Sequence, residues 1–361
     1  MNKNTSSVLW LSAVCGLSAG KIVKLCTIKE PAELVANLEG FRDRIVKVTD
    51  DKTYGNMLKL RDREALKERL EALSREHVTI ISQYDTEYPP LLAQIPNAPV
   101  LLYCKGDVSL LRAESVAIVG TRQPSTYGKD VASRFAESLA SAGLCIVSGL
   151  AKGIDSIAHE SAMKVGKTVA VLGCGIDVIY PQENKNLYAT IEEEGLLVSE
   201  YGLGEKAVMY HFPERNRIIS GLSKAVMVAE AGEDSGSLIT ATIAIEQGRG
   251  VYCAPSSVFS KKGAGGNSFL KTLQGTMVLE PDDILSDLGY GKAKRKKASA
   301  LQLDVNEQLI MDALEVEELH FDTLLELTKL SVPELSALLG RMELYGIVRR
   351  EDNNNYSVVP E

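Results

Sequence analysis

Glycine, serine and basic residues gather in five short segments of the chain: Gly120–Gly128, Ser148–Asp155, Phe212–Arg217, Glu230–Ser237 and Lys261–Asn267. Glycine lets a backbone approach an oxyanion closely, and free N–H groups at a helix N-terminus can donate to that oxyanion. Serine hydroxyls, Arg122, Lys152, Arg215 and Arg217 supply further donors and charge. One such glycine could simply serve a tight turn, but five segments together favour a groove lined for phosphate.

Other chemistries lack their sequence patterns here. The nearest match to the dinucleotide pattern G-x-G-x-x-G, at Gly173-Cys174-Gly175, has no third glycine, and no phosphate-loop pattern G-x-x-x-x-G-K-[ST] is present. Asp155 and His159 could touch on one helix face, but no serine or cysteine nucleophile is tied to them, so a structural contact is the favoured interpretation. The four histidines form no zinc pattern with the cysteines. We therefore expect no catalytic residue, no metal and no cofactor.

The elements that must position these loops form a strand–helix alternation between residues 115 and 285. Continuous apolar runs of this length are typical of a parallel sheet that is buried on both faces. Helical stretches separate the runs, so the sequence predicts an α/β fold with an extended, Rossmann-like, doubly wound parallel sheet. The loops would then meet at the carboxyl ends of the strands. The runs are Val116–Val119, Leu144–Val147, Thr168–Leu172, Leu196–Val198, Ala225–Ala229 and Val251–Ala254.

Smaller modules flank this central region. Residues 1–75 read as a helical N-terminal domain, whose favoured role is packing or a partner surface because no G-x-G hairpin for DNA is complete. The Rossmann domain is predicted at 76–288 and a basic linker at 289–300. Residues 301–361 show three helical patterns and a short β-rich end, which suggests a winged helix with Ser331–Leu344 as its recognition segment.

Length and charge set further limits. A chain of 361 residues predicts two or three domains, and 45% hydrophobic residues exclude disorder as its main state. The net charge of −8 excludes a uniformly basic, nucleic-acid-coating protein. Residues 301–361 hold 4 basic and 13 acidic residues, a net of 4 − 13 = −9, so we expect a protein-interaction module there. DNA binding through Arg349-Arg350 is the alternative.

The predicted location is the cytoplasm. None of the six cysteines lies in a C-x-x-C pair, and several stand in apolar runs, as in proteins of a reducing compartment. The apolar stretch Val8–Leu17 is too short to span a membrane and has no cleavage site. We expect no membrane anchor.

The loop motifs resemble those of the DprA/Smf family of DNA-processing proteins. The resemblance covers about half of the chain, in order from residue 115 to residue 285. Its most specific segment is Phe212-Pro-Glu-Arg-Asn-Arg-Ile-Ile-Ser-Gly-Leu222, and Ser148–Asp155, Tyr180-Pro181 and Glu246–Arg249 also match. The flanking helical and winged-helix modules fit the family layout.

Membership would imply a non-enzymatic protein with an extended Rossmann fold. Such proteins bind and protect single-stranded DNA, form homodimers and load the recombinase RecA during natural transformation. On this chain the implied DNA-binding residues are Gly120, Arg122, Ser125, Ser148, Gly149, Lys152, Gly153, Arg215, Asn216, Arg217, Ser235, Gly236, Ser237, Lys261 and Lys262.

Two expectations concern partners. We expect a homodimer through residues 240–280, because the apolar Ile243, Val251, Tyr252, Phe269 and Leu270 are hard to place together in one core. We expect Arg122 and Arg217 to contact phosphate.

A second class of function stays open. Rossmann-like proteins of the lysine-decarboxylase-like group bind nucleotides or cleave nucleoside monophosphates. Glu230–Ser237 and Glu246 echo that group only loosely, because its Pro-Gly-Gly-x-Gly-Thr loop is missing.

Overall fold

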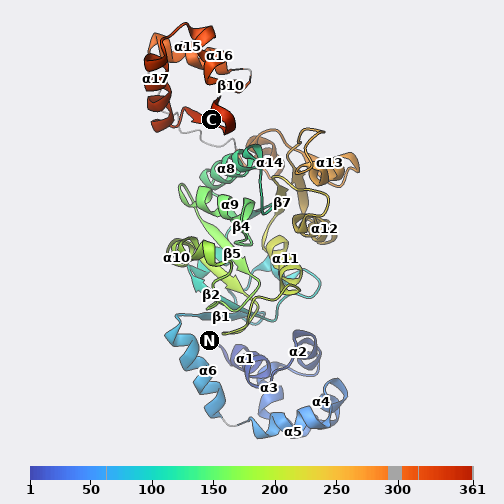
Figure 1. The fold of residues 1–361 in the computed structure, drawn as a ribbon. Coiled ribbons are helices and arrows are strands. Elements are labelled where there is room, and N and C mark those ends of the chain that lie inside the picture. Colours follow the sequence, from blue (N-terminus) through green and yellow to red (C-terminus); the bar gives the residue numbers. More distant parts are fainter. Residues whose placement is uncertain (62, 292–302, 316, 360–361) are drawn as a thin grey trace. The chain divides into compact units, whose positions relative to one another are not determined.

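The computed structural model describes residues 1–61, 63–291, 303–315 and 317–359 (Figure 1). The chain divides into two compact units, Met1–Lys294 and Arg295–Glu361, which we describe separately. The basic linker expected at 289–300 lies, from residue 292 onward, outside the described residues. Within the described parts, no helix combines the length and the apolar character needed to cross a membrane.

The first unit begins with short helices. They are α1 (Lys3–Leu9), a π-helical turn (Trp10–Val14), α2 (Ala19–Cys26), α3 (Pro31–Ala36), α4 (Arg42–Val48), α5 (Asp51–Lys59) and α6 (Arg63–Arg75). Their apolar side chains do not form an isolated core. Leu9 and Leu73 belong to the same buried cluster as Leu101 and Tyr103 of the sheet, so the helices pack directly on the strands.

The described residues of this unit form one nine-stranded sheet, in the order β1-β2-β6-β5-β4-β3-β7-β8-β9. The strands are β1 (Thr79–Ser82), β2 (Leu101–Gly106), β3 (Ser115–Val119), β4 (Cys145–Ser148), β5 (Thr168–Leu172), β6 (Leu196–Ser199), β7 (Ala225–Val228), β8 (Gly250–Cys253) and β9 (Thr276–Met277). Neighbouring strands from β3 to β9 pair in parallel, whereas β2 pairs antiparallel with both β1 and β6. Each of the six predicted apolar runs coincides with a strand to within one residue at either end.

Helices cover both faces of the sheet. Val116 and Ile118 point to the face covered by α8 (Thr126–Ser141), α9 (Ile154–Met163) and α14 (Pro281–Asp287). Ala117 and Val119 point to the opposite face, under α11 (His211–Leu222) and α12 (Gly236–Glu246). This alternation is what a strand buried on both sides requires. The remaining helices of the sheet region are α7 (Pro90–Ala93), α10 (Lys185–Glu194) and α13 (Ala264–Lys271).

The second unit has winged-helix architecture. Its elements are α15 (Val305–Leu314), β10 (Leu319–His320), α16 (Phe321–Thr328), α17 (Val332–Leu344), β11 (Val348–Arg350) and β12 (Asn355–Val358), with strand order β10-β12-β11. The Ser331–Glu334 capping box satisfies the free N–H groups at the start of α17. The predicted fold class, a parallel α/β sheet with a C-terminal winged helix, is confirmed.

Candidate functional site

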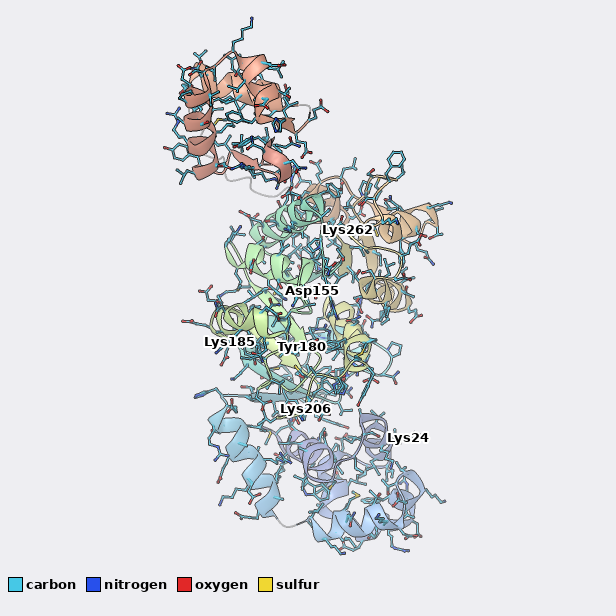
Figure 2. All side chains as sticks on the ribbon, in the orientation of Figure 1. Lys24, Asp155, Tyr180, Lys185, Lys206 and Lys262 are labelled. Carbon is cyan, nitrogen blue, oxygen red and sulfur yellow. The ribbon has the colours of Figure 1, made fainter. Side chains whose placement is uncertain are left out.

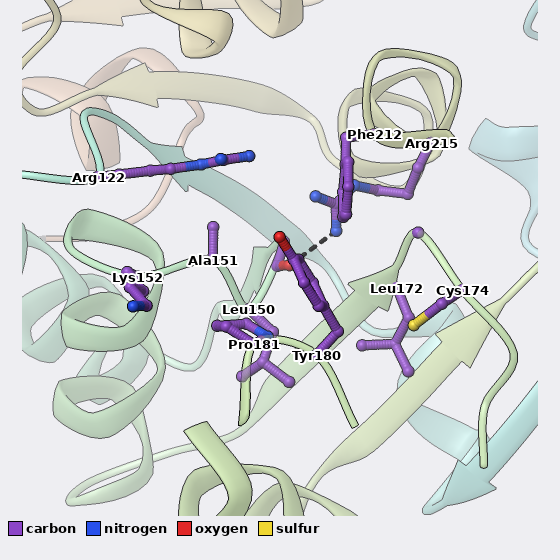
Figure 3. A pocket seen from close by; sticks show the side chains of 12 residues that line it. Arg122, Leu150, Ala151, Lys152, Leu172, Cys174, Tyr180, Pro181, Phe212 and Arg215 are labelled. Atoms are coloured by element: carbon purple, nitrogen blue, oxygen red, sulfur yellow. Dashed lines mark hydrogen bonds between the residues drawn. The ribbon is translucent and has the colours of Figure 1, made fainter. Parts of the chain in front are cut away.

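A pocket opens at the carboxyl ends of the central strands (Figure 3). We call it the edge pocket, and its volume is about 60 Å³. A single buried water needs at least about 10–15 Å³, so the edge pocket has room for one phosphate or part of one base, and not for a dinucleotide. Its lining residues are Arg122, Gly149, Leu150, Ala151, Lys152, Leu172, Gly173, Cys174, Tyr180, Pro181, Phe212 and Arg215.

The loop after β4 forms one wall of the edge pocket. The Ser148 hydroxyl donates to the Ile118 carbonyl at 2.6 Å, which fixes the start of this loop to the neighbouring strand. Gly153 ends the loop with φ +83°, and a side chain there would collide with the Thr121 carbonyl. Ser148 and Gly153 therefore shape the loop.

Arg215 forms the floor of the pocket and is only 5% exposed. Its Nη1 donates to the Gly149 carbonyl at 2.7 Å and also to the Val171 carbonyl. Burial lowers the pKa of Arg215, while the nearby Asp155 opposes that shift. Burial also raises the pKa of the Asp155 carboxyl, against the attraction of Arg215. The arginine therefore links the loop after β4 to strand β5 beneath the site.

Asp155 and His159, which the sequence placed on one helix face, each form hydrogen bonds with other groups. Asp155 accepts the backbone N–H groups of Gly149 and Ala151, at 3.1 and 3.3 Å. His159 is fully buried, and its Nδ1 lies 2.6 Å from the Thr168 hydroxyl. Because that hydroxyl donates to the Ile146 carbonyl, Nδ1 must be the donor in the histidine contact. Both side chains hold the fold together.

Arg122 and two aromatic rings stand at the mouth of the edge pocket. Arg122 is exposed, and its guanidinium carbon lies 5.8 Å from the centre of the Phe212 ring. The centres of the Phe212 and Tyr180 rings are 5.3 Å apart (Figure 3). Lys152 is half exposed and pairs with the exposed Glu183 at 2.5 Å. This pairing is weak in water, so Lys152 can exchange Glu183 for an anion.

The crevice between β3 and β7, where the strand order reverses, is already filled. Glu230 is 3% exposed, and its carboxylate accepts the Ser125 N–H at 2.7 Å and the Ser125 hydroxyl at 2.5 Å. Gly128 in the first turn of α8 fits only because it has no side chain, since a Cβ there would lie 2.4 Å from the Glu230 carboxylate. A fixed negative charge therefore occupies the place where Rossmann folds bind a pyrophosphate.

The other predicted site residues lie outside the edge pocket. Arg217 donates to Glu200 at 2.6 Å, an ion pair that the sequence did not suggest, and it does not line the pocket. Asn216 is partly exposed on the same helix. The Ser235 side chain caps α12 and lies 2.7 Å from the Ser237 hydroxyl, next to the exposed Gly236.

Two lysines extend the basic surface elsewhere. Lys261 and Lys262 are exposed before α13, and Figure 2 shows Lys262 well separated from Tyr180. The predicted residues are thus spread along the sheet edge. Arg122, Gly149, Lys152 and Arg215 alone come together in the edge pocket, and Gly120 packs against Ile154 and Glu230 beside it.

The sequence-based list omitted several residues of the site. Tyr180, Phe212 and Glu230 belong to motifs that the sequence analysis singled out, but their roles depend on contacts between distant segments. The Tyr180–Pro181 peptide bond is cis, and a side chain at Gly173 would lie 2.8 Å from the Phe212 ring. No group of three or more His, Cys, Asp or Glu side chains suited to a metal occurs among the described residues.

Comparison with known proteins gives consistent matches. The family model "DNA recombination-mediator protein A" matches residues 79–289, and "DprA winged helix domain" matches residues 294–354. Protein Smf of Synechocystis sp. is 31% identical over 361 aligned residues, which cover 89% of this chain and 88% of that protein. DNA processing protein DprA of Streptococcus pneumoniae is 44% identical over 207 residues, which cover 57% of this chain and 73% of that protein.

Two solved structures share the fold. The X-ray structure of DNA processing protein A from Streptococcus pneumoniae has a TM-score of 0.67 and 35% identity, and covers 78% of this chain and 97% of that one. A structure concerned with the single-stranded DNA binding mode of DNA processing protein A from Helicobacter pylori has a TM-score of 0.55 and 31% identity. It covers 60% of this chain and 99% of that one.

Proposed function

This chain belongs to the DprA/Smf family of DNA-processing proteins, and from that premise we propose that it binds single-stranded DNA along the carboxyl edge of its parallel sheet. The role is non-catalytic: the protein holds incoming DNA and passes it to RecA during recombination. The Helicobacter pylori relative, whose structure concerns single-stranded DNA binding, supports the choice of ligand.

One observation carries the proposal, which is the exposed Arg122 beside the Phe212 and Tyr180 rings at the edge pocket. A guanidinium attracts phosphate, and an aromatic face stacks on any base without reading its sequence. The edge pocket is narrow, with a volume of about 60 Å³. A single strand can place one phosphate or base there, whereas a duplex keeps its bases stacked inside. The preference for a single strand therefore follows from the small size of the pocket and from the exposed Tyr180 ring beside the partly exposed Phe212 ring.

We assign two kinds of role to the residues at this edge. Arg122, Lys152 and Asn216 contact the DNA, because their side chains reach the surface. Ser148, Gly149, Gly153 and Arg215 position the loops, because their groups are buried or committed to the backbone. The bound DNA strand continues past Ser235, Gly236 and Ser237 toward Lys261 and Lys262. Ser125 and Gly120 hold Glu230 and α9 in place. Arg217 has a positioning role, which it exerts through its ion pair with Glu200.

The protein is also proposed to form a homodimer through residues 240–280. The side chains expected to drive this contact need revision, because Val251 and Tyr252 are each only 5% exposed in the core. Ile243, Phe269 and Leu270 are partly buried. Val258, Phe259 and Leu273 are instead almost fully exposed, and β9 is the last strand in the order of the described sheet. An open strand edge and exposed apolar side chains favour pairing with another chain. Light scattering at micromolar protein concentration tests whether the protein is a dimer.

The winged-helix unit is proposed to bind protein and not DNA. Its exposed basic residue on α17, Arg341, is already bonded to Asp304 and Glu307. With a net charge of 4 − 13 = −9, residues 301–361 repel a polyanion. Val332 and Leu344 leave apolar surface at the two ends of the same helix, and the exposed Tyr345 follows it directly.

A titration of oligo-dT at two salt concentrations tests the main proposal. Arg122→Ala should weaken binding about tenfold, since a charge-assisted hydrogen bond contributes roughly 1.5–3 kcal/mol. It should also reduce the slope of log K against log salt by about 0.7, the value for one phosphate contact with a single strand. Arg44→Ala, which removes an exposed arginine of α4, is the matched control and should change neither quantity.

Two results would contradict the proposal. Equal affinity of the Arg122→Ala variant and the unaltered protein would remove Arg122 from the interface. Release of adenine from AMP would instead assign the chain to the nucleotide-cleaving group, a reading that the buried Glu230 carboxylate at the phosphate position disfavours.

A further inference from the structure

A second hollow lies where the N-terminal helices meet the sheet. We call it the helix–sheet pocket, and its volume is about 210 Å³, more than three times that of the edge pocket. Residues of α1, of the π-helical turn, of α6, of β2 and of the loop after β6 enclose it. They are Leu9, Ser12, Ala13, Arg69, Leu73, Tyr103, Gly202, Leu203 and Glu205.

Two opposite charges face this hollow without pairing. Arg69 and Glu205 are both exposed, and within the described residues neither has an ion pair or a side-chain hydrogen bond. Both act on the Tyr103 hydroxyl: burial raises the pKa of Tyr103 to about 12, Arg69 opposes this shift, and Glu205 adds to it. A cation and an anion therefore lie close to one buried tyrosine, from two segments far apart in the chain.

The Tyr103 hydroxyl is a further polar group at this hollow. Tyr103 as a residue is 3% exposed, and in the described part of the chain its hydroxyl makes no hydrogen bond. The hydroxyl oxygen remains accessible from the hollow, so it can bond to a ligand there. The Ser12 hydroxyl lines the same hollow, and Leu9, Leu73 and Leu203 give it an apolar side.

We propose that the helix–sheet pocket binds a small zwitterion of the amino-acid type. Its carboxylate faces Arg69, its ammonium faces Glu205, and Tyr103 and Ser12 donate or accept the remaining hydrogen bonds. The leucines receive an apolar side chain. A free phosphate or a DNA phosphate fits less well, because Glu205 would repel it. The size also suits a small metabolite, since drug-sized ligands occupy roughly 300–1,000 Å³.

Such a ligand would stabilise the contact between the helices and the sheet. A molecule that binds only the folded state raises the melting temperature in proportion to the logarithm of its concentration. The helix–sheet pocket and the edge pocket share no lining residue, so occupation of the one and DNA binding at the other are measured separately.

The proposal is tested by calorimetric titration of the full chain with each of the common free L-amino acids. Concentrations of up to about 10 mM are needed, because a small ligand can bind specifically with a dissociation constant of about 1 mM. We expect at least one amino acid with an apolar side chain to bind and to raise the melting temperature. Acetate and methylamine, which carry one charge each, should bind at least tenfold more weakly.

Variants locate the binding. Arg69→Ala and Glu205→Ala should each weaken it about tenfold, and Tyr103→Phe, which preserves the shape of the core, about three- to tenfold. Lys67→Ala, on the same helix and engaged with Glu64 and Glu71, is the matched control and should leave the affinity unchanged. Absence of any binding, binding that survives both charge-removing variants, or equal binding of acetate or phosphate would each overturn the proposal.

Discussion

The Arg215→Met substitution separates a residue that builds the site from one that contacts DNA. Methionine keeps the apolar stem of Arg215 but loses the donors to the Gly149 and Val171 carbonyls. It also leaves Asp155, which is 7% exposed, without its positive neighbour. Two lost charge-assisted hydrogen bonds cost about 3–6 kcal/mol, and leaving a buried charge without its opposite neighbour costs about 3–5 kcal/mol. Both figures describe the effect of removing one guanidinium group, so they are not added. We therefore expect the free energy of unfolding to fall by about 3–5 kcal/mol.

Thermal unfolding followed by circular dichroism measures this loss. For a unit of this size roughly 2 °C of melting temperature corresponds to 1 kcal/mol, so the expected drop is roughly 6–10 °C. Arg122→Met is the matched control, because it makes the same chemical change at an exposed position, and its melting temperature should stay the same. The additional change Asp155→Asn should restore part of the stability of Arg215→Met.

The pH dependence gives the same reasoning a second test. Without Arg215 the pKa of Asp155 rises further above its ordinary value, because Arg215 is the strongest of the influences that oppose burial. When the pKa of a carboxyl is raised in the folded state, the free energy of unfolding of the protein falls as pH rises toward that pKa. The difference in melting temperature between Arg215→Met and the unaltered protein should therefore become smaller in acid. A melting temperature within about 2 °C of the unaltered protein at neutral pH would refute the structural role of Arg215.

Three further predictions follow from single contacts. Burial, with help from Arg215, lowers the pKa of His159 to about 3. The unfolded chain therefore binds more protons than the folded chain below about pH 6.5, and the free energy of unfolding should fall by about 2 kcal/mol between pH 7.5 and pH 5. In denaturant titrations His159→Gln should remove that part of the pH dependence. Gly149→Ala would place a Cβ 2.6 Å from the Arg215 guanidinium and should cost about 1–3 kcal/mol, whereas Gly236→Ala, with no atom within 4 Å, should be nearly neutral. Deleting residues 291–361 should leave oligo-dT affinity largely intact, because all the residues proposed to contact DNA belong to the first unit. Loss of most of the affinity in a folded truncated protein would place DNA contacts in the removed segment.

The sequence by itself determined the layered architecture and the family. Strand positions could be read directly, because a strand buried on both faces must be apolar throughout, and the run Thr168–Leu172 is β5 residue for residue. The Ser331–Glu334 pair marked the start of α17 for a local reason, since both groups bond to backbone atoms within one turn. The glycines after the strands likewise marked where backbones approach one another, as at Gly153.

Only the tertiary structure decided which basic groups face the solvent. Arg215, Asn216 and Arg217 are consecutive, and all three were expected to bind DNA. Each residue of a helix turns by about 100°, so α11 buries Arg215 beneath the pocket and directs Arg217 to Glu200. The Glu230 carboxylate reaches Ser125 across 105 residues of chain, a contact that no local pattern encodes. Burial and long-range pairing depend on how the helices pack on the sheet, which is why the glycine-rich loops were visible in the sequence, whereas the burial of Arg215 and the Arg217–Glu200 ion pair were not.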